Sequence, residues 1–380
     1  MSAGAALAPH THASEIVIGT QVDLSGPLSG LGTAVRNGLV MAFDETNAAG
    51  GVNGRRLRLI AIDNGYDTAK AVAATKTLLK RDHIFAMLCP VGTPQVAATM
   101  PLVLNSGVLH LFPFTSADDT YVQSQPLEFA IDLPEAEQIS IGLGAILDMR
   151  GNLRVGVLYR DDDFGRAALK GAADEVARRG QQLAATASFA PGAENFGRAI
   201  ATLRNAGVEL VVIGAVSPEA LAALQQTTAR GWYPISLCGS ACYVPELPTL
   251  GGRTVSGLYA VATTPIPYPD DSDPALRDWV KHYERRFGTV ASAEALRAYL
   301  DARFFADALK RAGANPSERR VAHMLEAMSP WRDHEFGGIP IAFTSEDHVG
   351  FHTGLLAQVR NGRWAAMTGP LPTQVNARAH

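Results

Sequence analysis

The sequence predicts an α/β protein made of two doubly wound domains with parallel sheets. Short apolar runs of strand length alternate with longer amphipathic segments along almost the whole chain, and this alternation is typical of parallel sheets covered by helices. A chain of 380 residues is too long for a single hydrophobic core, so two domains are expected. Hydrophobic residues make up 47% and charged residues 18%, a balance that excludes a disordered chain.

The bulk composition also excludes several kinds of partner. The formal net charge is −4, from 33 basic and 37 acidic residues, and no stretch is densely basic, so nucleic acid is not an expected partner. No apolar run approaches the length that crosses a bilayer. Cys89, Cys238 and Cys242 are too few for a disulfide framework, and no second Cys/His pair follows them at zinc spacing. We therefore expect neither a metal nor a cofactor.

Residues 84–119 have the pattern of one strand–helix–strand unit. An apolar run at 84–88 predicts a strand, and a second run at 108–112 predicts another. Between them, Thr93 and Pro94 predict a helix start, with Thr as the N-cap and Pro at the first helical position. A helical crossover between two buried strands implies that the strands are parallel.

Both of these strands would end on the same edge of the sheet, beside Thr93 and the segment Pro-Phe-Thr-Ser at 113–116. Open α/β sheets bind ligands outside the carboxyl ends of their strands, and a helix N-terminus favours anions. We therefore expect this edge to hold a small ligand through its carboxylate. A simpler interpretation is that Thr93 only caps its helix and that Thr115 and Ser116 only shape a turn.

The remaining elements follow from apolar periodicity and from glycine and proline breaks. In the first half, strands are expected at 16–22 and 57–63, and helices at about 28–47 and 68–81. In the second half, strands are expected at 154–159, 183–189, 210–213, 235–238 and 258–262, and helices at 133–149, 166–179, 195–206 and 218–230. The last third should contain helices at 275–287, 293–312 and 321–328, and strands at 340–344, 354–360 and 363–367.

Taken in this order, four stretches resemble one protein family. They are VDLSGPLSGLG at 22–32, NAAGGVNGRRLRLIAID at 47–63, the unit at 84–119, and YRDDDFGRAALKG at 159–171. The family is that of the periplasmic substrate-binding proteins of ABC importers, in its branched-chain amino-acid-binding (Leu/Ile/Val-binding) group, with the type I periplasmic-binding-protein fold. The resemblance extends over about residues 15–370, and the NAAGGVNG block after a long helix is its most specific part.

The resemblance implies two lobes that are joined by three hinge crossovers and close on a ligand. Lobe one would comprise residues 15–133 and 263–340, and lobe two would comprise residues 134–262 and 341–372. The crossovers would lie at 128–134, 259–263 and 340–341.

The resemblance also implies a set of ligand-binding residues. Thr93 matches the family's hydroxyl ligand for the carboxylate, and Phe114, Thr115 and Ser116 match the loop opposite it. The walls and rim of the site would come from Leu31, Phe164, Val216, Ser217, Tyr243 and Tyr299. Ser240 stands where amino-acid binders carry an acid for the ligand's ammonium group, and a hydroxyl cannot replace that charge.

Because of Ser240, we expect a pocket that is more aromatic and less charged than that of an amino-acid binder. Such a pocket suits an aromatic or aliphatic carboxylate without an amine, or a small amide. If the alignment shifts by a few residues, Glu246 or Glu219 would supply the missing acid instead.

The function that the resemblance implies is that of an extracytoplasmic solute-binding protein. It would act as a monomer in the periplasm, with its export leader already removed, and deliver a small carboxylate to the membrane subunits of an ABC permease. Residues 1–13 themselves lack the basic start and apolar core of a secretory signal. A cytoplasmic ligand sensor with the same fold is the alternative.

An enzyme is the competing class, and its motifs are weak. The acidic run 161–163 has the pattern of a solvated helix start, and His110 lies inside an apolar strand. Gly26, Gly30 and Gly32 follow a strand, but their spacing is not that of a dinucleotide fingerprint. We therefore expect a binding protein and no catalytic residues.

Overall fold

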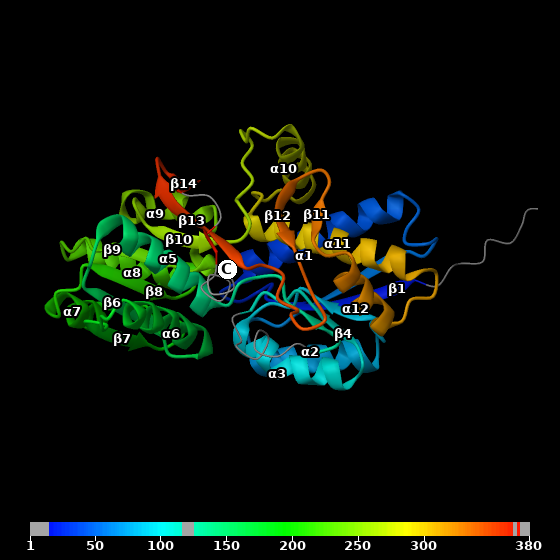
Figure 1. The fold of residues 1–380 in the computed structure, drawn as a ribbon, viewed down its shortest axis with the longest axis horizontal. Coiled ribbons are helices and arrows are strands. Elements are labelled where there is room, and N and C mark those ends of the chain that lie inside the picture. The colour runs from blue at the N-terminus through cyan, green and yellow to red at the C-terminus, as the bar shows by residue number, and fades with distance from the viewer. Residues whose placement is uncertain (1–14, 116–124, 368–370, 373–380) are drawn as a thin grey trace, which may run out of the picture.

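The computed structural model describes residues 15–115, 125–367 and 371–372, and these residues form two α/β units, each built on one open sheet (Figure 1). The first sheet is wholly parallel, with the order β2-β1-β3-β4-β5. Its strands are β1 (Ile16–Val22), β2 (Leu57–Asp63), β3 (Ala86–Leu88), β4 (Leu109–Leu111) and β5 (Glu128–Phe129).

The second sheet has the order β14-β13-β10-β9-β8-β6-β7, with β15 paired to β13. Its parallel part comprises β6 (Val155–Arg160), β7 (Ala185–Phe189), β8 (Leu210–Gly214), β9 (Ile235–Cys238) and β10 (Tyr259–Ala262). Its antiparallel edge comprises β13 (Thr353–Arg360), β14 (Arg363–Ala366) and β15 (Leu371–Pro372). In the first sheet β1 lies between β2 and β3, and in the second sheet β6 lies between β7 and β8. The strand order thus reverses at β1 and at β6, and open α/β sheets bind ligands at such switch points.

Helices connect the strands and cover the sheets. They are α1 (Ser29–Ala48), α2 (Thr68–Lys80), α3 (Thr93–Asn105), α5 (Glu135–Arg150), α6 (Asp163–Arg178), α7 (Gly197–Asn205), α8 (Ser217–Ala229), α9 (Glu246–Gly251), α10 (Pro274–Phe287), α11 (Ala293–Ala312) and α12 (Glu318–Ala327). Two short 3-10 helices lie at Ser240–Cys242 and Gly252–Val255, and a small two-stranded sheet pairs β11 (Trp331–Asp333) with β12 (Gly337–Ile341). None of the described helices is long and apolar enough to cross a membrane.

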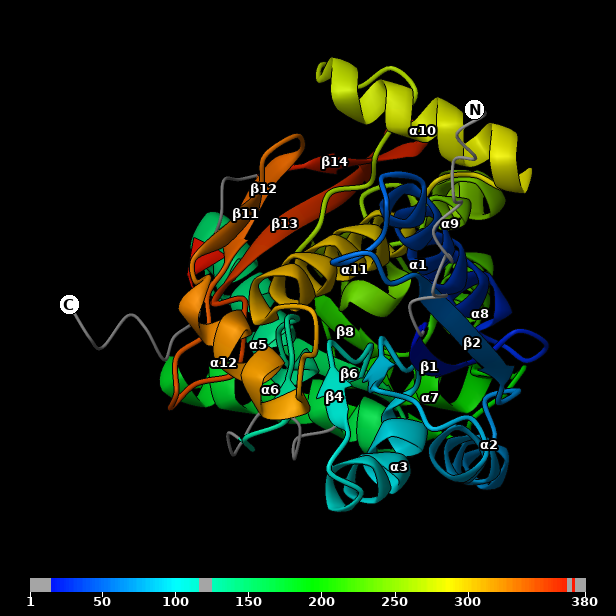
Figure 2. The same cartoon turned by 90° about the vertical axis from the view of Figure 1, so that its right-hand side faces the viewer.

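Helix α11 comes late in the chain but packs on α1 in the first unit (Figure 2). The approach is close at Gly38, where a Cβ atom would lie 2.3 Å from the carbonyl oxygen of Ala295. The core of this unit joins residues of the first sheet with α1, α10, α11 and α12. The chain therefore returns to the first unit after β10, and it adds β13, β14 and β15 to the second sheet only afterwards.

Most element bounds agree with the sequence prediction, and the α/β doubly wound fold is confirmed. One local prediction is wrong: Thr93 is the first residue of α3, and the N-cap position is Gly92, whose φ of 107° suits only glycine. The strand expected at 340–344 lies earlier, at Gly337–Ile341.

The lobe boundaries remain a proposal, and the packing suggests one change. Phe343 lies in the first core cluster, with its ring 6.3 Å from that of Phe112 and 5.1 Å from that of Phe129. Phe351 is buried in the same cluster. We therefore propose that the third crossover follows Phe351, and that it does not lie at 340–341.

Candidate functional site

A cavity lies where the strand-end loops of the two sheets meet, with about 750 Å³ of empty space when its open mouth is included. Its wall from the first unit includes Leu31, Thr93, Phe114 and Thr115, and its wall from the second unit includes Phe164, Val216, Ser240 and Tyr243. The structure thus brings together eight of the predicted site residues around one space. Their roles toward a ligand remain a prediction.

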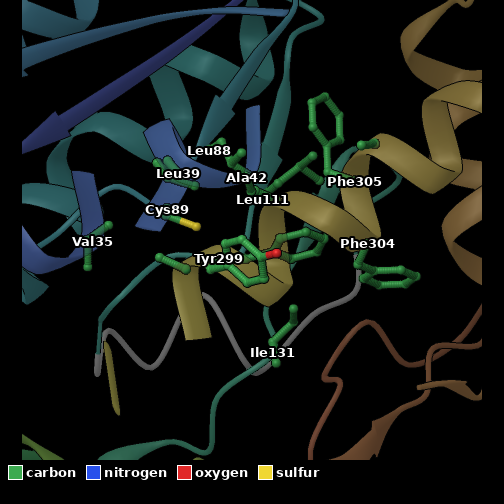
Figure 3. Close-up of a cluster of buried hydrophobic side chains, with 14 of the residues drawn as sticks. Val35, Leu39, Ala42, Leu88, Cys89, Leu111, Ile131, Tyr299, Phe304 and Phe305 are labelled. Carbon is green, nitrogen blue, oxygen red and sulfur yellow. The ribbon is translucent and has the colours of Figure 1, made fainter. Parts of the chain in front are cut away.

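The other three predicted residues have different outcomes. Ser217 begins α8 and does not line the cavity. Tyr299 also does not line it. The side chain is 2% exposed, its hydroxyl donates to Glu45 at 2.5 Å, and its ring packs against those of Trp279 and Phe336. Figure 3 shows it within the buried apolar cluster of the first unit. Ser116 lies outside the described residues.

Two loops of the first sheet form the floor beside Thr93. The Gly92 N–H donates to the carbonyl oxygen of Phe114 at 3.0 Å, and the Phe114 N–H donates to that of Pro90 at 2.8 Å. These bonds fix the first turn of α3 against the loop that carries Thr115. Since backbone N–H groups in a first helical turn have no partner within the helix, this floor is suited to an anion.

The cavity carries three charged residues that sequence reasoning did not place there, namely Asp132, Glu294 and Arg297. The pocket therefore carries charges that the sequence did not indicate, and its charge relative to that of an amino-acid binder stays a prediction. Asp132 accepts a short hydrogen bond from Arg297 and another, at 2.8 Å, from the hydroxyl of Thr263. These contacts tie the first predicted crossover to the second and to helix α11.

Glu294 occupies the first turn of α11, behind the N-cap Ser292, and is only 9% exposed. Burial raises the pKa of its carboxyl group to about 7, although its hydrogen bonds with Ser292 and its own backbone N–H oppose this shift. Neither Glu246 nor Glu219, the acids considered as substitutes for Ser240, lines the cavity. Glu294, like Asp132, is therefore a carboxylate of the cavity lining that sequence reasoning did not place there.

A side-chain contact connects the two units next to the cavity residues Tyr66 and Phe164. Arg160, at the end of β6, donates to the hydroxyl of Tyr66 in the loop after β2 at 2.8 Å. Arg160 is 2% exposed, forms an ion pair with Asp162 at 2.7 Å, and lies over the ring of Phe164. The contact joins the two halves of the cavity wall, so it can form only when the units are close together.

The acidic run 161–163 has the structural role predicted for it. The Asp162 side chain caps α6 by accepting from the Gly165 N–H at 3.1 Å. Asp161 and Asp163 both form ion pairs with Arg166 on the surface. Among the described residues, no group of three or more histidine, cysteine or acidic side chains could hold a metal ion.

Comparison with known proteins agrees with this architecture. The family model described as periplasmic binding protein matches residues 15–363. Leu/Ile/Val-binding protein homolog 7 of Brucella suis biovar 1 (strain 1330) is 23% identical over 325 residues, which are 82% of this chain and 81% of that protein.

Two solved structures are similar over nearly the whole chain. A substrate-binding periplasmic protein from Ralstonia solanacearum is 27% identical with a TM-score of 0.83, over 93% of this chain and 100% of the other. A fatty acid ABC transporter substrate-binding protein from Thermomonospora curvata is 18% identical with a TM-score of 0.85, over 96% of this chain and 94% of the other.

Proposed function

This chain belongs to the periplasmic binding protein family, and from that premise we propose that it captures a small carboxylate between its two lobes. It would hold the ligand without transforming it and deliver it, outside the cytoplasm, to the membrane subunits of an ABC permease. The observation that carries this proposal is the cavity formed by strand-end loops of both sheets, with the first turn of α3 in its floor. The similar proteins include a Leu/Ile/Val-binding protein homolog and a fatty acid ABC transporter substrate-binding protein, and both amino acids and fatty acids carry a carboxylate.

The lining favours a ligand with an apolar body. Phe114, Phe164 and Tyr243 present rings to the cavity, and Leu31 and Val216 add aliphatic surface. Burial of apolar ligand surface is favourable by about 25 cal/mol per Å². A ligand that contacts both lobes would then increase the population of the closed conformation, which the permease would bind.

A thermal-shift screen against amino acids, amides, and aliphatic and aromatic acids tests the proposal, because a ligand that binds only the folded state raises the melting temperature. We expect carboxylates to give the largest shifts. A screen in which esters or amides protect as well as the parent acids would contradict the carboxylate assignment.

Thr93→Ala should weaken the strongest carboxylate hit of that screen by more than about tenfold, because a hydrogen bond to a charged group is worth about 1.5–3 kcal/mol. Isothermal titration calorimetry gives the affinity. Thr93→Ser keeps the hydroxyl and is the matched control, so it should bind nearly as well as the unaltered protein. Unchanged affinity of the alanine variant would remove Thr93 from the site.

Tyr66→Phe should weaken the same ligand by about tenfold, because the bridge from Arg160 to the Tyr66 hydroxyl stabilises only the closed arrangement. The melting temperature of the ligand-free protein should change little. Tyr233→Phe is the control, because Tyr233 is 76% exposed and does not line the cavity. Equal affinities for the Tyr66→Phe variant and the unaltered protein would show that the bridge does not contribute to closure.

A further inference from the structure

The charges around the cavity do not balance. Of the three charged residues that line it, Asp132 and Arg297 form an ion pair with each other. Glu294 forms no ion pair with any residue that the structure describes. Among the described residues, the lining therefore carries one acid in excess, on a side chain that is about nine-tenths buried.

The groups that face Glu294 do not neutralise it. Arg297, one turn further along α11, attracts it, but that guanidinium is bonded to Asp132. Glu246 of α9 repels it, and the phenol groups of Tyr243 and Tyr283 are neutral at ordinary pH. A second anion placed in this cavity would add repulsion at low dielectric, whereas a positive group would remove it.

We propose that Glu294 is the specificity-determining residue that receives a protonated nitrogen of the ligand. The first turn of α11 would thus supply the negative charge for the ligand's nitrogen, which Ser240 in the loop after β9 cannot supply. The inference rests on the proposed function, because it takes the ligand's carboxylate to lie at Thr93 and adds a cationic group at the other end. The ligand class is then a zwitterion with an apolar body.

The rings around the cavity agree with this assignment. Phe114, Phe164 and Tyr66 line the same space, and the faces of aromatic rings attract cations. Phe114 and Phe164 already lie against the guanidinium groups of Arg297 and Arg160, at 4.4 and 5.3 Å from ring centroid to carbon. The cavity wall is therefore suited to positive charge beside Glu294.

Two matched pairs of compounds test the inference by calorimetry. L-Leucine is compared with 4-methylpentanoate, and L-phenylalanine with 3-phenylpropanoate, so that each pair differs only in the ammonium group. We expect the amino acid of at least one pair to bind more than about tenfold tighter than its deaminated partner. Glu294→Gln should abolish that preference, while Glu246→Gln, outside the cavity lining, should retain it.

The outcomes separate the two proposals. If in both pairs the deaminated acid binds as tightly as its amino acid, or if Glu294→Gln weakens both members of a pair equally, the role of Glu294 is overturned while the carboxylate site stands. If neither class binds, and the broader screen yields no carboxylate, the proposed function and the inference both fail.

A second measurement uses the unaltered protein and does not depend on the folding of a variant. Titration near pH 7 in buffers of different ionisation enthalpy reports the protons exchanged on binding. A cation at Glu294 favours its ionised form, so the amino acid should release a fraction of a proton. Net proton uptake would mean that Glu294 binds the ligand as a neutral acid, and this would overturn the inference.

Discussion

Asp132→Ala should destabilise the protein by about 3–5 kcal/mol, because it removes the carboxylate that is hydrogen-bonded to the buried guanidinium of Arg297. Arg297 is 4% exposed, and the other ion pair that it forms with a described residue is to Asp301, at 3.5 Å. The hydroxyl of Thr263 would lose its acceptor at the same time. Urea unfolding followed by tryptophan fluorescence gives the change in the free energy of unfolding.

Two further variants distinguish a charge effect from a packing effect at Asp132. Asp132→Asn keeps a hydrogen-bond acceptor for Thr263 but removes the charge, so it should lose less stability than the alanine variant. Adding Arg297→Met to Asp132→Ala removes the buried positive charge as well and should restore most of the lost stability. A loss below about 1 kcal/mol for Asp132→Ala would contradict the view that this ion pair holds the crossovers together.

The sequence predicted the regular elements well where a long periodic pattern met clear end residues. The bounds of β1, β2, β9 and α11 are those expected from apolar runs and their flanking residues. The two-residue strand β5 and the six-residue helix α9 were missed, because such short segments show no periodicity. Gly92 was missed as the N-cap of α3 because a threonine followed by proline is the more usual start.

The predicted residues that line the cavity lie in the loops and first helical residues that follow strands, where fold topology determines their position. Thr93, Phe164 and Ser240 are of this kind. The charged residues were missed because their place depends on tertiary packing: Arg297 meets Asp132 across 165 positions of sequence. The only local sign of Glu294 was its place behind Ser292 at a helix start, and many surface acids have the same position.

Glu135→Gln should make the protein more stable than the unaltered protein at pH 8, and this gain in stability should be much smaller at pH 5. Glu135 is 1% exposed, and neither of its carboxylate oxygens has a hydrogen-bond partner among the described atoms. It lies beneath the loop that carries Ser240, since a Cβ atom on Gly239 would lie 2.1 Å from its Oε1 atom. Burial, with a smaller contribution from the charge of Asp132, raises the pKa of Glu135 to about 8.

The sign of the effect follows from proton linkage. The usual glutamate pKa, 4.5, is lower than the pKa of Glu135 in the folded protein, so between these values the folded state binds more protons than the unfolded state. The stability that Glu135 contributes is therefore fully present below pH 4.5 and is lost as pH rises toward about 8, by up to about 1.4 kcal/mol per pH unit. Glutamine does not titrate, so the variant escapes this loss.

Urea unfolding at several pH values between about 5 and 8 measures this difference. The stability of Glu135→Gln minus that of the unaltered protein should grow by up to about 3 kcal/mol across the range. Glu194→Gln is the control, because Glu194 is exposed and its replacement should leave the pH dependence unchanged. Parallel stability curves for Glu135→Gln and the unaltered protein would show that Glu135 is already ionised in the folded state, because water or a shift of the Ser240 loop solvates it.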